Sequence, residues 1–314
     1  MKITILDTSN CDWKPIAQKF HDKNSVNICS DNWNSDDIQI VERIGSESSS
    51  AEVYKLKIGE YPEMAGKIMP IVSDESIRNN LNEIEIAQYL SDLNDPHFPF
   101  VYGSFYCENT IYSENSLFVE DSYRYFLYRN LITPSLSTSQ KKRLLHKCRV
   151  ENLDSLKLEF GDVPIGSHVL LSSLSFCDLR SFPQCFSDIV ITENIWEYII
   201  IEILKTIKLL NEDLNIMHGD LHMGNILLNV TVNNELSVPV IHDFGKSKKM
   251  DEWSMYDRIT DVGTFFNDLL INPFIPEKIK NKISILNNYV DEVKFNDLSF
   301  PIMNIVQHKF LNIL

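Results

Sequence analysis

The sequence predicts an α+β protein in which an antiparallel β-sheet part is followed by a mainly helical part. Short runs rich in β-branched and aromatic residues, bounded by Gly, Pro and Ser, fill residues 38 to 108. Apolar residues recur at helical spacing through much of the second half. With 314 residues, 44% of them apolar, the chain can bury a core large enough for two lobes.

The same patterns divide the chain into three segments. We expect an N-terminal extension over residues 1–37, a first lobe over 38–174 and a second lobe over 175–314. The first lobe includes an insert at about residues 109–163, whose pattern is irregular.

Composition excludes several classes of protein. A formal charge of −15 repels phosphate backbones, so general nucleic-acid binding is not expected. The six cysteines have neither a C-x-x-C pair nor zinc spacing, which is typical of reduced thiols in a cytoplasmic protein. No export signal and no membrane span are expected, because the start lacks a basic segment followed by an apolar one, and the longest apolar run, "IWEYIIIEILKTIKLL", is interrupted by charges such as Glu197, Glu202 and Lys205.

Four runs of the first lobe are predicted strands: "IQIVERI", "AEVYKLKI", "AGKIMPI" and "FPFVYGSFYC". One helix is predicted among them, over about residues 74–93, from apolar residues at helical spacing. Glu83 falls inside its apolar arc. A buried carboxylate is costly unless a cation meets it, so either Glu83 pairs with a residue such as Lys67 or its side chain reaches solvent.

Two further helical segments follow. The stretch "QKKRLLHKCR", in the insert, indicates a solvated helix face or, alternatively, a docking site for an acidic partner. A longer helix is predicted from a cap at Thr192 to about Asn211, with an apolar stripe in the core. The members of that stripe are Trp196, Ile199, Ile203, Ile207 and Leu210.

The stretch "IMHGDLHMGNILL" sets polar residues inside an apolar run. The spacing of His218 and His222 fits a zinc-binding helix, but Gly219 and Asp220 disfavour helix there and no glutamate is placed as a base. A two-metal phosphoesterase would need further Asp and His ligands on other strands, and no convincing D-x-H is present. Both interpretations are therefore weak.

A third interpretation uses the downstream stretch "VPVIHDFGKS", where a strand-like run precedes Asp243. Phosphoryl transfer needs a carboxylate that accepts the proton of the nucleophile and oxygen ligands for Mg²⁺. Asp220, Asn225 and Asp243 have these chemistries. The two polar clusters are expected at strand ends on one hairpin.

These residues give the chain a resemblance to the protein-kinase-like superfamily. "HGDLHMGN" matches the pattern H-R-D-L-x-x-x-N at four positions, and "DFG" matches in full. The resemblance implies a bilobal fold, with Asp220 as the base and with Asn225 and Asp243 as Mg²⁺ ligands. It also implies that Lys67 binds the α- and β-phosphates of ATP and that Glu83 orients Lys67.

The resemblance extends to the glycine-rich loop of the family, represented by "IGSESSSAEVYK". It places Ile44, Gly45, Val53, Ala65 and Lys67 at the ATP. Ser and Ala stand where the family has two more glycines, which predicts weaker or altered binding of the phosphates because glycine lets backbone N–H groups approach closely.

The catalytic-loop region also departs from the family. Gly219 stands where regulated kinases carry an arginine, and His222 replaces a lysine that touches the transferred phosphate. Between Asp243 and Asp261, which resembles the anchor of the catalytic loop, there is no A-P-E triplet. The short segment resembles atypical Ser/Thr kinases of large DNA viruses, and H-G-D-L-H also occurs in aminoglycoside and choline kinases.

The resemblance implies an ATP- and Mg²⁺-dependent serine/threonine protein kinase, in the cytoplasm or, for a viral protein, in the host cytoplasm or the virion. Lys246, Lys248 and Lys249 either favour an acidic protein substrate or are merely solvated. Two alternatives stay open, a small-molecule kinase of the aminoglycoside or choline type and a pseudokinase that serves as a binding module.

Overall fold

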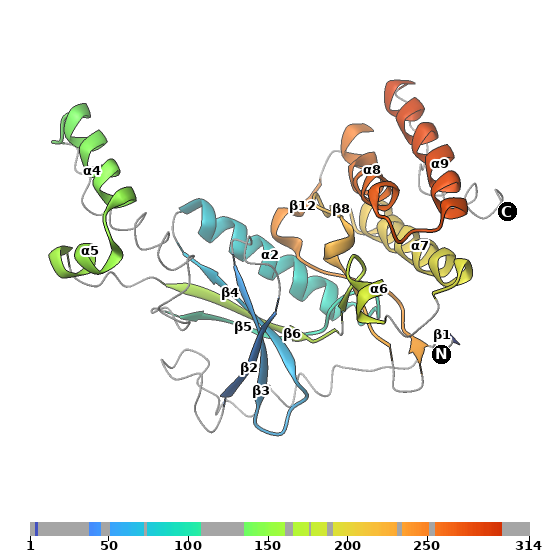
Figure 1. The fold of residues 1–314 in the computed structure, drawn as a ribbon, viewed down its shortest axis with the longest axis horizontal. Coiled ribbons are helices and arrows are strands. Elements are labelled where there is room, and N and C mark those ends of the chain that lie inside the picture. The colour runs from blue at the N-terminus through green and yellow to red at the C-terminus, as the bar shows by residue number, and fades with distance from the viewer. Residues whose placement is uncertain are drawn as a thin grey trace. The chain divides into compact units, whose positions relative to one another are not determined.

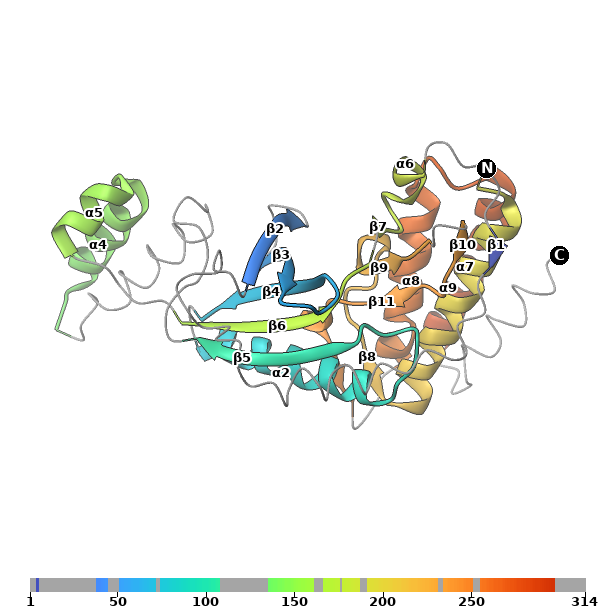
Figure 2. The same ribbon diagram turned by 90° about the horizontal axis from the view of Figure 1, so that it is seen from below.

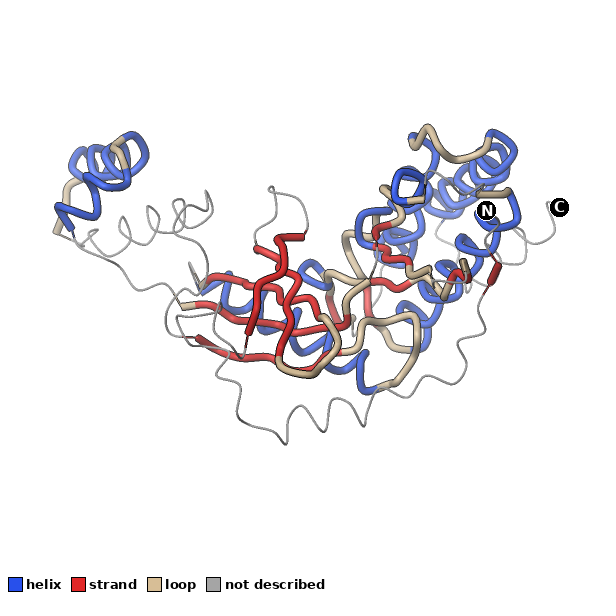
Figure 3. The backbone as a smooth tube through the Cα atoms, turned by 60° about the horizontal axis from the view of Figure 1, so that its bottom comes forward, coloured by secondary structure: helices blue, strands red, loops and turns tan. Residues whose placement is uncertain are grey.

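The computed structural model describes ten segments of the chain: residues 4–5, 38–44, 51–71, 74–107, 135–160, 166–175, 177–186, 191–230, 234–250 and 255–296. They form two compact units. The strand-rich unit comprises the described residues of 38–81 and 101–174, and the helical unit comprises those of 1–14, 82–100 and 175–314. Colouring by secondary structure separates strands from helices in Figure 3. The predicted α+β class, an antiparallel sheet followed by helices, is confirmed.

A five-stranded antiparallel sheet, in the order β2-β3-β4-β6-β5, forms the strand-rich unit (Figure 1). Its strands are β2 (Ile38–Ile44), β3 (Glu52–Ile58), β4 (Met64–Pro70), β5 (Val101–Cys107) and β6 (Ser167–Ser173). Burial alternates strictly along β3, as it does in a sheet with one covered face. The four predicted strands of this region are all present.

Helix α2 (Asp74–Asp92) matches the predicted helix to within one residue at its C-terminal end (Figure 2). Its residues up to Leu81 belong to the strand-rich unit and those from Asn82 to the helical unit. The Asn80 side chain donates hydrogen bonds to the carbonyls of Met69 (3.1 Å) and Pro70 (3.2 Å), which fixes the start of the helix against the end of β4.

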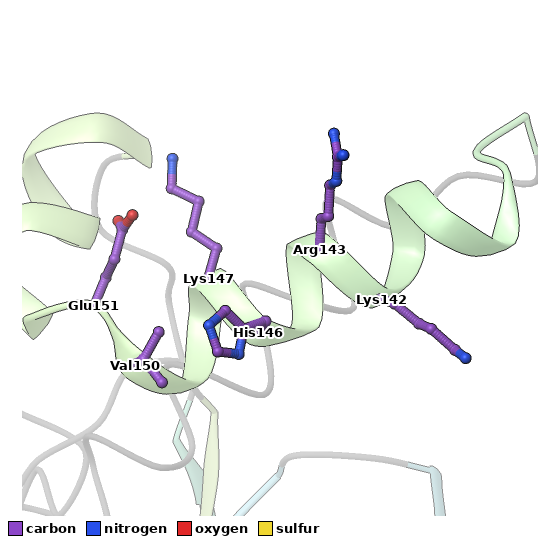
Figure 4. A pocket seen from close by; sticks show the side chains of 6 residues that line it. All are labelled: Lys142, Arg143, His146, Lys147, Val150 and Glu151. Carbon is purple, nitrogen blue, oxygen red and sulfur yellow. The ribbon is translucent and has the colours of Figure 1, made fainter.

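The described part of the insert contains helices α4 (Thr138–Val150) and α5 (Leu153–Phe160). A capping box starts α4, with Ser137 and Gln140 bonded to each other's backbone N–H groups. Lys147 reaches Glu159 of α5 at 2.6 Å. Other basic side chains around a surface hollow, Lys142 and Arg143, point away from α4 in different directions (Figure 4). This arrangement favours the solvated-face interpretation.

Helices α7 (Glu193–Lys208), α8 (Met255–Ile271) and α9 (Glu277–Asn296) pack together in the helical unit. Thr192 occupies the predicted N-cap of α7, but its side chain makes no capping hydrogen bond, and the predicted end near Asn211 lies in a π-helical turn, η1 (Leu209–Asp213). All five residues of the predicted apolar stripe are buried. The core of this unit therefore follows the sequence pattern.

Short strands complete the helical unit. A three-stranded sheet has the order β11 (Val240–Ile241), β9 (Ile226–Leu228) and β7 (Cys177–Asp178), next to helix α6 (Phe182–Cys185). Strand β8 (Ile216–Met217) pairs with β12 (Lys248–Lys249), and β1 (Thr4–Ile5) pairs in parallel with β10 (Glu235–Leu236). These pairs set the ends of the loops that carry the polar residues.

Two further observations bear on the expectations from composition. Cys107 is disulfide-bonded, so the expectation that all cysteines are reduced thiols is wrong at this position, although Cys148, Cys177 and Cys185 form no disulfide. Thiol content therefore does not argue for a reducing compartment.

Across the segments that the structure describes, no helix has the length and apolar character needed to cross a membrane.

Candidate active site

The residues His218 to Asn225, here called the polar loop, are held by two carboxylates of α8. Asp261, only 1% exposed, accepts hydrogen bonds from the backbone N–H groups of His218 and Gly219, both at 2.8 Å. Seven residues later on α8, Asp268 accepts the N–H of Met223 at 2.6 Å. Because residues seven apart lie on one helix face, α8 fixes both halves of the loop.

Both histidines of the polar loop are used by the backbone. His218 is fully buried, its Nε2–H donates to the carbonyl of His242 (2.9 Å), and its Nδ1 accepts the N–H of Asp220 (3.3 Å). Burial lowers the pKa of His218 although the carboxylates of Asp261, Asp243 and Asp220 raise it, so its ring is neutral. Because both ring nitrogens of His218 are hydrogen-bonded to the backbone, His218 is not a zinc ligand in this structure.

His222 makes a local contact that the resemblance did not imply. It is the N-cap of the 3-10 turn η2 (Met223–Asn225), where its Nδ1 accepts the N–H of Gly224 at 3.0 Å. The ring therefore stabilises the turn that positions Asn225. Among the described residues, no group of three or more His, Cys, Asp or Glu side chains could hold a metal ion.

Asn225 and Asp243 lie at the ends of two paired strands, as the predicted hairpin requires. Ile226 of β9 pairs with Ile241 of β11, and the N–H of His242 donates to the carbonyl of Asn225 at 3.1 Å. The Asn225 amide nitrogen donates to the carbonyl of Asp220 at 3.0 Å, which leaves the amide oxygen as its ligand atom. The polar loop and Asp243 are thus brought together around His218.

Asp243 has a strained backbone. Its φ of 65° and ψ of 69° lie in the left-handed region, which costs about 1–3 kcal/mol for a residue other than glycine. Mg²⁺ is commonly held by one or two carboxylates, substrate phosphates and water rather than by a cage of protein ligands. The Asp243 carboxylate and the Asn225 amide oxygen fit that donor set, and Mg²⁺ held there would neutralise phosphate charge.

Asp220 is partly exposed. Its side chain is 31% exposed, and its Oδ2 lies 2.8 Å from Nζ of Lys246, whose side chain is 67% exposed. Lys246 belongs to the 3-10 turn η3 (Phe244–Lys246), directly after Asp243. The sequence placed this lysine in a basic segment but did not predict that it reaches the proposed base.

The second half of α2 contributes two side chains to this region. Glu83 is 5% exposed, and its Oε2 lies 3.2 Å from the position that a Cβ would take on Gly245, so a side chain there would press on the carboxylate. The side chain of Asn82 donates to the carbonyl of Ser247 at 2.7 Å. Burial of Glu83 is confirmed, and its pairing with Lys67 stays a prediction.

Four of the predicted nucleotide-binding residues lie on one face of the five-stranded sheet. Register pairs Ile44 with Val53 and Val53 with Lys67, so these three form one cross-strand row. Ala65, two residues before Lys67 on β4, faces the same way. All four are partly exposed. Gly45 and the rest of the loop to Ser50 lie outside the described residues.

Two residues that support the polar loop were missed in the sequence. Asp268 could have been found from its seven-residue spacing to Asp261. Asn211, in the π-helical turn, donates to Asp261 at 3.0 Å and to the carbonyl of Ile216 at 2.8 Å, and no pattern signals that position. Comparison with known proteins adds no relationship, since no protein-family model matches the chain and no curated protein is significantly similar to it.

Proposed function

We propose that the protein is an ATP- and Mg²⁺-dependent phosphotransferase of the bilobal protein-kinase-like class, acting on a serine or threonine hydroxyl of a protein. The observation that carries the proposal is the arrangement of Asp220, Asn225 and Asp243 around one buried, neutral histidine. A carboxylate beside two oxygen ligands for a metal is the set of groups that phosphoryl transfer needs.

In this proposal each residue has one task. The substrate hydroxyl oxygen forms a bond to the γ-phosphorus of ATP, the bond from that phosphorus to the β–γ bridging oxygen breaks, and ADP leaves. The hydroxyl proton passes to the carboxylate of Asp220, whose 31% exposure makes it accessible to a substrate. Asn225 and Asp243 would hold Mg²⁺, which supplies charge neutralisation when bound.

The sheet would bind the nucleotide. Lys67 would bind the α- and β-phosphates with Glu83 as its orienting partner, and the partly exposed row of Ile44 and Val53, with Ala65 beside it, would contact the adenine. The strict alternation of burial along β3 supports this assignment, because it keeps one face of the sheet partly open.

Support for an acidic substrate is reduced. Two of the three lysines that suggested it are paired within the chain, Lys246 with Asp220 at 2.8 Å and Lys249 with Glu85 at 2.7 Å. Lys249 also lies 5.4 Å from the ring centre of Tyr89, in a cation–π arrangement. We therefore propose a protein hydroxyl as acceptor without a preference for acidic sequence.

The test is transfer of the γ-phosphate from labelled ATP with Mg²⁺ to acidic proteins, basic proteins and small amino-alcohols. Asp220→Asn should reduce the rate about 10²–10⁴-fold because the proton acceptor is lost. Asp243→Ala should lose metal-dependent transfer, whereas Asp213→Asn, an exposed aspartate of the same unit, should leave the rate unchanged.

Each outcome has a distinct meaning. Label on protein that is lost in Asp220→Asn and Asp243→Ala supports the proposal. Label only on amino-alcohols would replace it by a small-molecule kinase. Binding of ATP without any transfer would point to a pseudokinase, and full activity of Asp220→Asn would exclude the assigned base.

A further inference from the structure

We infer that Lys246 is a catalytic residue of this site: its ammonium group contacts the phosphoryl group in transfer, while His222 is a positioning residue. The inference rests on the proposed function. It assigns to Lys246 the contact with the transferred phosphate that the resemblance gave to the position of His222. It begins from the 2.8 Å separation of Lys246 Nζ and Asp220 Oδ2.

Lys246 can contact a phosphoryl group without leaving Asp220. Its side chain is 67% exposed, so no buried network fixes it away from solvent. An ammonium group has three N–H donors, so one can stay on Asp220 while the others reach an oxygen of the γ-phosphoryl group beside the base. A cation at that place opposes the negative charge on the transferring group and its neighbours.

The backbone that carries Lys246 is fixed against the polar loop. Gly219 has a φ of 78°, and a Cβ added to it would lie 2.7 Å from the carbonyl oxygen of Lys246. Ser247 Oγ donates to the carbonyl of His218 at 3.0 Å, and Lys248 pairs with Met217 between β12 and β8. Glycine at 219 therefore allows the close approach that brings Lys246 to Asp220.

His222 is occupied by another task. Its Nδ1 accepts the N–H of Gly224, so that nitrogen carries no proton while the bond is made, and the ring is then neutral. A Cβ on Gly224 would lie 3.0 Å from Cε1 of His222, which shows that the ring lies directly against the turn. The histidine thus shapes the turn before Asn225 and contributes no full charge.

The experiment compares four variants with the wild-type protein: Lys246→Met, Lys246→Arg, His222→Asn and, as a matched control, Lys248→Met, an exposed lysine two residues further on. Asparagine at 222 keeps a side-chain oxygen that can cap the turn. We would measure the single-turnover transfer rate and the dissociation constants of ADP and of ADP with aluminium fluoride, which resembles the transferring phosphoryl group.

Lys246→Met should slow transfer by about 10²-fold and weaken binding of ADP with aluminium fluoride by a similar factor. Its affinity for ADP alone should change less than about threefold, because the lost contact belongs to the transition state. Lys246→Arg should restore part of the rate. His222→Asn and Lys248→Met should stay within about tenfold of wild type, given that neither loses the transition-state contact.

Failure of the inference can be told from failure of the proposed function. Wild-type transfer and wild-type analogue affinity in Lys246→Met, with Asp220→Asn inactive, would overturn only the role of Lys246. If His222→Asn lost as much transfer rate and analogue affinity as Lys246→Met, the phosphate contact would belong to the histidine. That result would also overturn the inference. Absence of transfer by the wild-type protein would remove the proposed function and this inference together.

Discussion

The polar loop of the helical unit and the open face of the five-stranded sheet position their residues by different means. In the loop, backbone N–H groups of His218, Gly219 and Met223 bond to carboxylates of a neighbouring helix. On the sheet, strand alternation and register alone align Val53 and Lys67. Two carboxylates of one helix, Asp261 and Asp268, therefore determine the loop, whereas many equivalent backbone bonds determine the sheet.

The opposite face of the sheet shows the limit of this contrast. Glu52 is 1% exposed, its Oε1 lies 3.5 Å from Nη2 of Arg43, and its Oε2 accepts the hydroxyl of Tyr54 at 2.9 Å. Burial and the hydrogen bond to Glu52 raise the pKa of Tyr54, which keeps the hydroxyl protonated as the donor. The one buried carboxylate described in this sheet thus braces the strands next to the predicted phosphate loop.

The largest effect should come from Asp261→Ala. Three donors lose a buried charged acceptor, the N–H groups of His218 and Gly219 and the side chain of Asn211. We expect the free energy of unfolding to fall by about 4 kcal/mol, since each buried donor left without a partner costs about 1–3 kcal/mol. Urea unfolding would measure it, with Glu277→Ala on the exposed start of α9 as the control. A loss under about 1 kcal/mol would contradict the dependence on buried charge.

Replacing one of three glycines by alanine, and measuring the free energy of unfolding each time, would compare the two regions. Gly219→Ala adds a clash 2.7 Å from the carbonyl of Lys246 to a φ of 78°, so the loss should be about 3 kcal/mol. In the strand-rich unit, Gly59→Ala meets nothing within 4 Å at a φ of 50°, so backbone strain alone should cost about 1 kcal/mol.

The third glycine is the control with neither feature. Gly263, in α8, has nothing within 4 Å of an added Cβ and no left-handed φ, so Gly263→Ala should stabilise by about 0.5–1 kcal/mol. Thermal and urea unfolding of the three variants would separate strain from steric contact. Equal losses for Gly219→Ala and Gly59→Ala would mean that the loop adapts to the added methyl group.

Much of the fold followed from periodicity. The helix at residues 74–92 and the buried stripe of α7 were predicted because apolar residues at helical spacing must face a core. The strands of the sheet were predicted from short β-rich runs between turn residues, and Glu83 from its place in an apolar arc. These features depend on local pattern, which the sequence contains directly.

The contacts that assemble the candidate site depend on residues far apart in the chain. Asp268 accepts the N–H of Met223, which lies 45 residues earlier in the chain. Lys246 reaches Asp220 where glycine at position 219 allows the carbonyl of Lys246 to approach closely. The π-helical turn that presents Asn211 has no signature in composition. His222 was assigned to the phosphate by analogy, and its hydrogen bond from the N–H of Gly224 was not predicted. The kinds of residue in the candidate site could be predicted from the sequence, whereas their hydrogen-bond and ion-pair partners could not.

The last predicted change concerns the loop after α2, which a charged histidine joins to α7. His97 Nδ1 lies 2.7 Å from Asp95 and its Nε2 lies 3.2 Å from Glu202 of α7, while its carbonyl accepts the N–H of Ile241 next to Asp243's strand end. Burial lowers the pKa of His97, but the hydrogen bonds to Asp95 and Glu202 outweigh it and raise the pKa to about 9. Lys205 and Tyr198, also on α7, lie beside Glu202.

A pKa raised above its unfolded value of about 6.5 stabilises the fold fully below that pH, and the contribution disappears as pH rises through about 9. We expect the wild-type protein to lose about 2 kcal/mol of unfolding free energy between about pH 6.5 and 9 that His97→Gln does not lose. Urea unfolding across that range would measure the difference, with His146→Gln, an exposed histidine, as the control. Parallel pH profiles for wild type and His97→Gln would show that register and apolar packing hold this loop, as on the sheet, and that buried charge governs only the polar loop.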